Sequence, residues 1–294
     1  MDYVAQLKAL PKQHDFFIGF DSDGCVFDTM EIKQKECFCP AVIKHMSVQS
    51  VSKVAREVWE FINLYSKTRG CNRFLALERF LKLLRERHES IERGVGVPEF
   101  AEMSAWIQRE SKLGNPTLAT EVETTGNEEL KKLLAWSLEV NERITDMVYG
   151  ISPFPFVKDV LEQGRGKADM IVVSQTPLEA LTREWEENKI EGYIEMIAGQ
   201  EHGTKTEHIH FATEGKGYDS AKILMIGDAP GDYKAAAENN ALFFPIVPGN
   251  EEASWQGLAG EGLARFFEGT YAGEYQQKRL DEFDAALPEE PHWN

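Results

Sequence analysis

Long apolar runs and cysteines are scarce in this sequence of 294 residues. No run approaches the roughly 20 apolar residues that a membrane helix needs. The four cysteines all lie in the first quarter of the chain. Cys37 and Cys39 lack both the two-residue gap and the second cysteine pair of a typical zinc site. We therefore expect reduced thiols, as in cytoplasmic proteins.

Basic residues are also scarce relative to acidic residues. Lysine and arginine number 32 against 49 aspartates and glutamates, so the formal net charge is −17. Such a surface repels nucleic acids and anionic lipids. We therefore expect neither a nucleic-acid partner nor a membrane partner. The first 15 residues lack the basic and then apolar pattern of a secretory signal, and the expected location is the cytoplasm.

Short apolar runs alternate with helical patterns in the second half of the chain. Strands are expected over 16–20, 171–173, 194–198, 223–226 and 241–247, and helices over 177–188, 204–212 and 232–239. The helix over 177–188 is expected to begin at Pro177, with Thr176 as its N-cap. Strands that alternate with helices predict a parallel sheet covered on both faces. The expected fold class is therefore α/β, with a doubly wound, Rossmann-like core.

Residues 30–150 follow a different pattern, in which apolar residues recur at spacings of three and four. This spacing predicts helices over about 51–65, 74–84, 98–110 and 130–148. No central strand is evident there. We therefore expect a discontinuous α/β core, made of residues 1–29 and 151–294, with an inserted helical domain over 30–150. Residues 249–294 are expected to extend the core at its C-terminal end.

Polar residues follow three of the predicted strands. Asp21 and Asp23 come after the first strand, Ser174 after the second, and Asp228 and Asp232 after the fourth. The carboxyl ends of parallel strands meet at one edge of a sheet, where ligands bind. Crowded carboxylates repel one another, so a divalent cation is their natural partner. Ligands that are all oxygen favour Mg²⁺ over zinc.

These motifs, in this order, resemble those of the haloacid dehalogenase superfamily. The matching residues are Asp21, Asp23, Gly24 and Asp28 in the first motif, Ser174 in the second, Lys205 in the third, and Gly227, Asp228 and Asp232 in the fourth. The resemblance covers residues 15–29 and 151–248. Two positions depart from the common pattern. Cys25 stands where the family usually has Thr, and Thr206 follows Lys205 where Pro is common, so Lys216 and Lys222 remain alternatives to Lys205.

The resemblance implies a phosphatase that works through a covalent intermediate. Asp21 would attack phosphorus and form an aspartyl-phosphate. Asp23 would protonate the leaving oxygen and later activate water, and its presence favours phosphate-ester hydrolysis over dehalogenation. Mg²⁺ would be held by the carboxylates of Asp21 and Asp228 and by the backbone carbonyl of Asp23. Asp232 would support the metal or orient the lysine.

The resemblance also implies how the substrate is held. Ser174 and Lys205 would bind phosphate oxygens, with Gln175 beside them. The helical insertion would be a cap that selects a small phosphorylated metabolite. The residues themselves add one expectation, that Arg69 or Arg73, in a break between two predicted helices, reaches an anionic or hydroxylated group of the substrate. Surface arginines that pair with nearby glutamates are the alternative.

Two other functions stay open at this point. A phosphomutase of the beta-phosphoglucomutase type would share every core motif, and would differ only in passing the phosphoryl group to a sugar hydroxyl. A catalytically idle binding protein would be expected to have lost Asp21, Asp23 or Asp228, and all three are present. The sequence identifies neither the substrate nor the oligomeric state.

Overall fold

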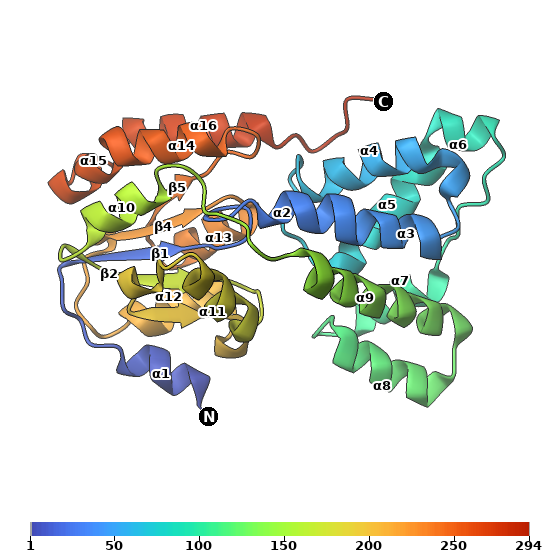
Figure 1. Ribbon diagram of the computed structural model, residues 1–294, viewed down its shortest axis with the longest axis horizontal. Coiled ribbons are helices and arrows are strands. Elements are labelled where there is room, and N and C mark those ends of the chain that lie inside the picture. Colours follow the sequence, from blue (N-terminus) through green and yellow to red (C-terminus); the bar gives the residue numbers. More distant parts are fainter. Residues whose placement is uncertain (1, 294) are drawn as a thin grey trace. The chain divides into compact units, whose positions relative to one another are not determined.

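A computed structural model describes residues 2–293 of the chain. The chain divides into two compact units (Figure 1). The core unit comprises Met1–Met30 and Gly150–Pro288, and the helical unit comprises Glu31–Tyr149 and Glu289–Asn294. None of the described helices is both long and apolar enough to cross a membrane.

The core unit is built on a five-stranded sheet in which every pair of neighbours is parallel. The strand order is β3-β2-β1-β4-β5. The strands are β1 (Phe16–Phe20), β2 (Ala168–Val173), β3 (Met196–Ala198), β4 (Ile223–Gly227) and β5 (Leu242–Pro245). Every residue of β2 and β4 is buried, as expected for strands covered on both faces. The structure confirms the predicted α/β fold class.

Helices cover both faces of this sheet (Figure 1). They are α1 (Tyr3–Ala9), α10 (Val157–Gly164), α11 (Leu178–Glu187), α12 (Lys205–Thr213), α13 (Pro230–Glu238), α14 (Glu251–Gly257), α15 (Leu263–Glu268) and α16 (Glu274–Ala286). Ile18 and Phe20 of β1 share a buried cluster with residues of α10, α14 and α15. Phe17 shares the other cluster with residues of α1, α12 and α13. Side chains that alternate along β1 thus build two separate cores.

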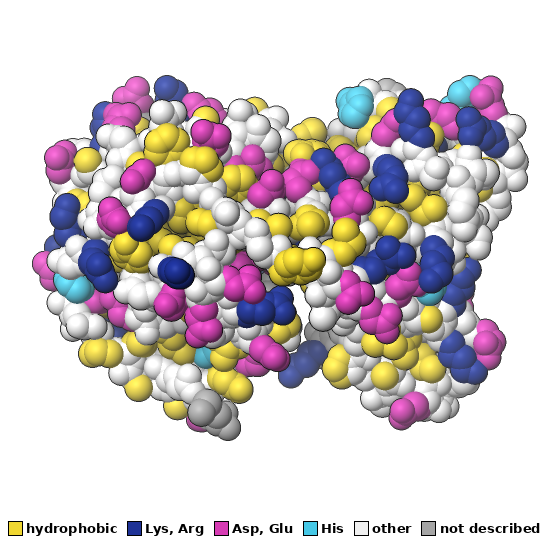
Figure 2. Space-filling model, in the orientation of Figure 1, with side chains coloured by type: hydrophobic (Ala, Val, Ile, Leu, Met, Phe, Trp, Pro, Cys, Tyr) yellow, Lys and Arg dark blue, Asp and Glu magenta, His cyan; other side chains and the backbone are white. Residues whose placement is uncertain are grey.

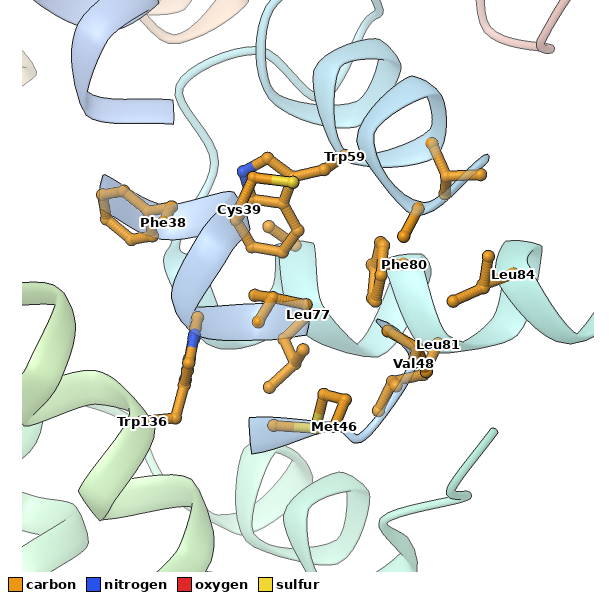
Figure 3. Packing of buried hydrophobic residues seen from close by; sticks show 14 of the residues in the cluster. Phe38, Cys39, Met46, Val48, Trp59, Leu77, Phe80, Leu81, Leu84 and Trp136 are labelled. Atoms are coloured by element: carbon orange, nitrogen blue, oxygen red, sulfur yellow. The ribbon is translucent and has the colours of Figure 1, made fainter. Parts of the chain in front are cut away.

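The helical unit packs around its tryptophans. Its helices are α3 (Cys39–His45), α4 (Ser52–Asn63), α5 (Arg73–Glu86), α6 (His88–Glu92), α7 (Ala101–Arg109), α8 (Asn115–Thr125) and α9 (Glu128–Met147), and the short α2 (Thr29–Ile32) spans the boundary between the units. Trp59, Trp106 and Trp136 are almost completely buried. Trp59 and Trp136 meet edge to face, with ring centroids 6.3 Å apart, in the cluster that Figure 3 shows.

The end of the chain differs from the expected division. Residues from Glu289 onward group with the helical unit, whereas the sequence pattern placed them with the core. An Arg79 guanidinium nitrogen donates to the carbonyl of Glu289 at 2.6 Å. The Trp293 ring packs edge to face on Phe61, with centroids 5.2 Å apart, and the guanidinium of Arg87 lies 4.8 Å from its centroid. These aromatic contacts attach the tail to α4 and to the end of α5.

Charged side chains of both signs are spread over the face of the molecule that Figure 2 shows. On the face that Figure 2 shows, lysines and arginines are scattered among acidic residues and do not gather into one basic patch.

Candidate active site

Two adjacent strands and a helix bring three carboxylates together at one edge of the sheet. Asp21 follows β1 and Asp228 follows β4, and these two strands pair directly. Asp232 lies in the first turn of α13. Carboxylate oxygens of the three residues lie within 4.8 Å of one another. The residues are 4%, 1% and 0% exposed, so the cluster is shielded from bulk water.

The loop after β4 fixes this arrangement through its backbone. One oxygen of the Asp232 carboxylate accepts the backbone N–H groups of Asp228 at 3.2 Å and of Ala229 at 3.0 Å. A Cβ atom at Gly227 would lie 2.4 Å from the Cβ of Asp232, so only glycine fits at that position. The backbone N–H of Asp21 donates to the carbonyl of Ile226 at 2.9 Å. The pairing of β1 with β4 therefore continues as far as the first carboxylate.

Lys205 connects two of these carboxylates. Its Nζ lies 2.7 Å from Oδ2 of Asp21 and also bonds to Oδ1 of Asp232. Lys205 is the first residue of α12, and the side chains of Thr204 and Glu207 form a capping box around that first turn. The capping box fixes the backbone from which the lysine side chain extends.

The two alternative lysines are engaged elsewhere. Nζ of Lys216 donates to the carbonyl of Leu7 at 3.0 Å, and Nζ of Lys222 lies 3.6 Å from the carboxylate of Asp15. Of the three candidates, Lys205 is therefore the one that the structure places in the acidic cluster.

Burial and crowded charge shift the protonation of the cluster. Burial raises the pKa of Asp21, as do the neighbouring carboxylates of Asp232 and Asp228, while Lys205 opposes the rise. Burial alone would lower the pKa of Lys205, but Asp21 and Asp232 outweigh it and hold that pKa above its usual value. Three carboxylates face one ammonium group, so the cluster favours an added proton or cation. Its all-oxygen donor set fits a hard divalent ion.

Two threonine hydroxyls hold Asp23. Thr29, at the start of α2, donates to Oδ1 at 2.6 Å, and Thr176, after β2, donates to Oδ2 at 2.6 Å. The expected role of Thr176 as an N-cap is wrong. Helix α11 begins at Leu178, and Pro177 occupies the cap position without a side-chain cap bond. Neither contact was predicted, since the sequence shows only a threonine before a proline and one six residues after Asp23.

Ser174 and Gln175 follow β2, the other neighbour of β1. Ser174 is 2% exposed, and its Oγ accepts the backbone N–H of Thr176 at 3.2 Å. Its own backbone N–H donates to the carbonyl of Ala198 at 3.0 Å. The Gln175 side chain donates to the carbonyl of Gly203 at 2.8 Å. The structure thus places Ser174 at the same edge of the sheet as Asp21 and turns Gln175 toward the loop before α12.

The unusual Cys25 is a buried, uncharged neighbour of the cluster. Its Sγ lies 3.7 Å from the carbonyl of Ile226. Burial raises the pKa of the thiol well above its usual value, and the charges of Asp228 and Asp21 add to the rise. A thiol held neutral in this way is a poor nucleophile.

Comparison with known proteins decides the family. The family described as "haloacid dehalogenase-like hydrolase" matches residues 98–245, just over half of the chain. The chain belongs to the haloacid dehalogenase-like hydrolases. The matched segment begins after β1, so it includes Ser174, Lys205 and Asp228 but not Asp21 or Asp23. No curated protein matches the sequence.

A solved structure shares this architecture. A proposed phosphoglycolate phosphatase from Lactobacillus delbrueckii subsp. bulgaricus is 15% identical, with a TM-score of 0.51 over 89% of this chain and 100% of that chain. A haloacid dehalogenase-like hydrolase from Streptococcus pneumoniae is 14% identical, with a TM-score of 0.45 over 82% and 90% of the two chains. At 15% identity, the likeness to the first of these structures shows the fold alone.

In this hydrolase the two arginines expected to contact substrate have partners inside the helical unit. Arg69 is 4% exposed and donates to the carbonyl of Leu64 at 2.9 Å. Arg73 donates to Oγ of Ser137 at 3.0 Å and to the side-chain oxygen of Asn141 at 2.8 Å. Burial lowers the pKa of Arg73 to about 10. A contact of either arginine with substrate stays a prediction.

Proposed function

We propose that this chain is a Mg²⁺-dependent phosphatase that hydrolyses a small phosphorylated metabolite through an aspartyl-phosphate on Asp21. The observation that carries the proposal is the buried carboxylate of Asp21, paired with Lys205 and crowded by Asp228 and Asp232. A nucleophile in such a place can meet an anionic phosphate only if positive charge accompanies it. The lysine supplies one such charge.

The hydrogen bonds around Asp21 suit an in-line attack on phosphorus. Oδ1 accepts the backbone N–H of Ser22 at 2.8 Å, and Oδ2 pairs with Lys205 at 2.7 Å. The carboxylate is thereby held in one orientation, which lowers the entropic cost of attack. Lys205 would neutralise a phosphate oxygen, and Ser174 would donate a hydrogen bond to another. Gln175 lies next to Ser174 and would contact the same group.

Asp23 would transfer the protons. In the first step its carboxyl proton passes to the leaving oxygen as Asp21 bonds to phosphorus. In the second step Asp23 takes a proton from water, the water oxygen bonds to phosphorus, and Asp21 leaves as a carboxylate. Asp23 follows Asp21 by two residues, so one loop carries the nucleophile and the group that moves the protons.

The carboxylates of Asp21 and Asp228 would hold Mg²⁺, together with the backbone carbonyl of Asp23 and support from Asp232. The bound ion would supply positive charge that screens the anionic nucleophile from the anionic phosphate. The raised pKa of Asp21 supports this assignment, because burial and the charges of Asp232 and Asp228 disfavour its ionised form, which a cation would stabilise. The helical unit would act as the cap that selects the substrate.

The test is a screen of phosphorylated metabolites, with Mg²⁺ and with EDTA, on the wild type and Asp21→Asn. We expect release of free phosphate to require Mg²⁺ and to fall by roughly a thousandfold or more in Asp21→Asn, as for loss of a covalent nucleophile. The variant should be as stable as the wild type, because it removes a carboxylate from a crowded buried cluster.

Asp15→Asn is the matched control. The Asp15 side chain is 72% exposed and lies just before β1, so the same change there should leave turnover intact. Activity that persists in EDTA and in Asp21→Asn would refute the proposal. A rearranged phosphate ester in place of free phosphate would identify a phosphomutase instead.

A further inference from the structure

Ser22 lies directly after the proposed nucleophile, and its backbone groups hold the loop that carries it. The backbone N–H of Ser22 donates to Oδ1 of Asp21 at 2.8 Å. The carbonyl of Ser22 accepts the backbone N–H groups of Cys25 at 3.3 Å, Val26 at 2.9 Å and Phe27 at 3.1 Å. The residue is completely buried. One residue thus orients the carboxylate of Asp21 and closes the turn that follows it.

The hydroxyl of Ser22 joins this loop to helix α11. Its Oγ accepts the indole N–H of Trp185 at 3.1 Å and donates to a carboxylate oxygen of Glu184 at 3.2 Å. An indole N–H can only donate, so the hydroxyl is the acceptor in the first bond and keeps its own proton for the second. Trp185 follows Ser22 by 163 residues, so this contact forms only when the core unit folds.

Trp185 is itself held in place by packing. Its side chain is completely buried in the cluster that also contains Ile18 and Phe20 of β1. The Trp185 ring meets the ring of Phe27 edge to face, with centroids 5.9 Å apart. Leu181, one turn earlier in α11, is also completely buried. A large ring in a closely packed interior keeps one position, so its N–H is a fixed point for the loop.

The chain just before Trp185 contacts the same loop a second time. Helix α11 begins two residues after Thr176, whose hydroxyl donates to Oδ2 of Asp23 at 2.6 Å. Ser174, which is expected to hold phosphate, precedes Thr176 by two residues. The segment that carries the phosphate ligand is therefore bonded to the nucleophile loop at Asp23 and again at Ser22.

We propose that Trp185 is a positioning residue, which holds Asp21 in its attacking orientation through the hydroxyl and the backbone N–H of Ser22. This inference rests on the proposed phosphatase, in which Asp21 attacks phosphorus. The attacking oxygen must lie in line with the bond that breaks, and a small displacement costs much of the rate. Trp185 acts on the loop alone, and transfers no proton and no charge.

Trp185→Phe and Ser22→Ala remove the two sides of one hydrogen bond. Phenylalanine keeps a buried aromatic ring without the indole N–H, and alanine lacks only the hydroxyl oxygen. With p-nitrophenyl phosphate and Mg²⁺, we expect each variant to lower kcat and kcat/KM equally, by roughly tenfold, with KM unchanged. That pattern is typical of lost alignment in the transition state. The double variant should be no slower than the slower single variant, because both changes break the same contact.

Hydrogen exchange gives a readout that needs no turnover. The amide at position 22 donates to Asp21, so it should exchange about tenfold faster in both variants, while the amides of β1 keep their wild-type rates. Trp59→Phe is the matched control. Trp59 is also completely buried, and its indole N–H donates to Oε1 of Gln34 at 2.9 Å within the helical unit. This variant should lower the melting temperature as Trp185→Phe does, with kcat and the exchange at position 22 unchanged.

Three outcomes distinguish the role of Trp185 from the proposed function. Activity that needs Asp21, with wild-type kcat in Trp185→Phe and Ser22→Ala, would overturn the role of Trp185 and leave the phosphatase intact. A lower kcat without faster exchange at position 22, or an equal fall in Trp59→Phe, would show a general loss of stability and would also overturn it. Activity that does not need Asp21 would refute the proposed function itself.

Discussion

The residues of the proposed site place several charged groups in the interior of the core unit. Asp21, Asp228, Asp232 and Lys205 place four ionisable groups in a buried cluster. Taking charges out of water is expensive, and well-packed apolar residues at such places are often as stable or more so. Packing alone therefore gives no reason for the cluster. The loss of stability that these buried charges cause is understandable if the charges act on a substrate.

A second buried polar group belongs to the same helix as Lys205. His208 of α12 is completely buried, and its ring lies edge to face with that of His202, with centroids 6.1 Å apart. Burial lowers the pKa of His208 to about 4, and the charges of His202 and Lys205 act in the same direction, against the backbone hydrogen bond of Gly203 and the charge of Glu207. The folded protein therefore holds this imidazole neutral.

His208 should make the protein sensitive to acid. The unfolded chain takes up a proton below pH 6.5 that the folded chain refuses until about pH 4, so stability falls as pH drops through that window. The loss from this one group amounts to roughly 3 kcal/mol. In His208→Leu, the fall in unfolding free energy between pH 7 and pH 4, measured by denaturant titration, should shrink by about that amount.

His210→Leu is the control for this prediction, because its ring lies on the same helix but is 48% exposed. Its pH dependence should match that of the wild type. Equal slopes for His208→Leu and the wild type would mean that the buried ring does not remain neutral in the folded protein.

Among the strands and helices, those with a clear sequence pattern were predicted, and those with a weak pattern were missed or misplaced. The five strands were predicted because each is a short apolar run with polar flanks. Helix α8 was missed because its sequence, NPTLATEVETT, buries only Leu118 and carries several threonines. The start of α11 was misplaced because a threonine before proline is a reasonable N-cap. The sequence does not reveal that the hydroxyl of Thr176 bonds to Asp23 instead.

The first turn of α12 links helix stability to the site. Thr204 accepts the backbone N–H of Glu207 at 3.2 Å, and Lys205 follows it directly. Thr204→Ala should lower the unfolding free energy by about 1 kcal/mol, the usual cost of a lost cap. It should also lower kcat several-fold, because fraying of this turn displaces Lys205. Denaturant titration and steady-state kinetics measure the two effects.

Asn127→Ala tests whether the kinetic effect is local. Asn127 caps α9 in the helical unit by accepting the N–H groups of Glu129 at 2.9 Å and Leu130 at 3.2 Å. We expect a similar loss of stability with kcat unchanged. A comparable fall in kcat for both variants would indicate that general destabilisation is the cause.

At the scale of the whole molecule, the order of the strands in the sheet explains why residues far apart in the sequence could be assigned to one site. Asp21, Ser174 and Asp228 are spread over more than 200 positions, yet each follows a strand, and β2, β1 and β4 are neighbours in the sheet. The parallel alternation of strands and helices is enough to predict that convergence. Contacts that depend on side-chain rotamers, such as those of Asp23, and the path of the tail have no comparable periodic signal.

That tail should stabilise the helical unit specifically. Trp293 packs on Phe61 of α4 and lies beside Arg87, which follows α5. One aromatic pair and one cation–π contact together contribute roughly 1–2 kcal/mol.

A chain that stops at Pro288 should therefore show hydrogen exchange about five- to thirtyfold faster in α4 and α5, with the strands of the core unit unchanged. Trp293→Ala should reproduce most of this effect, whereas Glu290→Ala, which changes an exposed side chain of the same tail, should not. Equal acceleration in both units would contradict a local role for the tail, and unchanged exchange in α4 would show that its aromatic contacts add no stability.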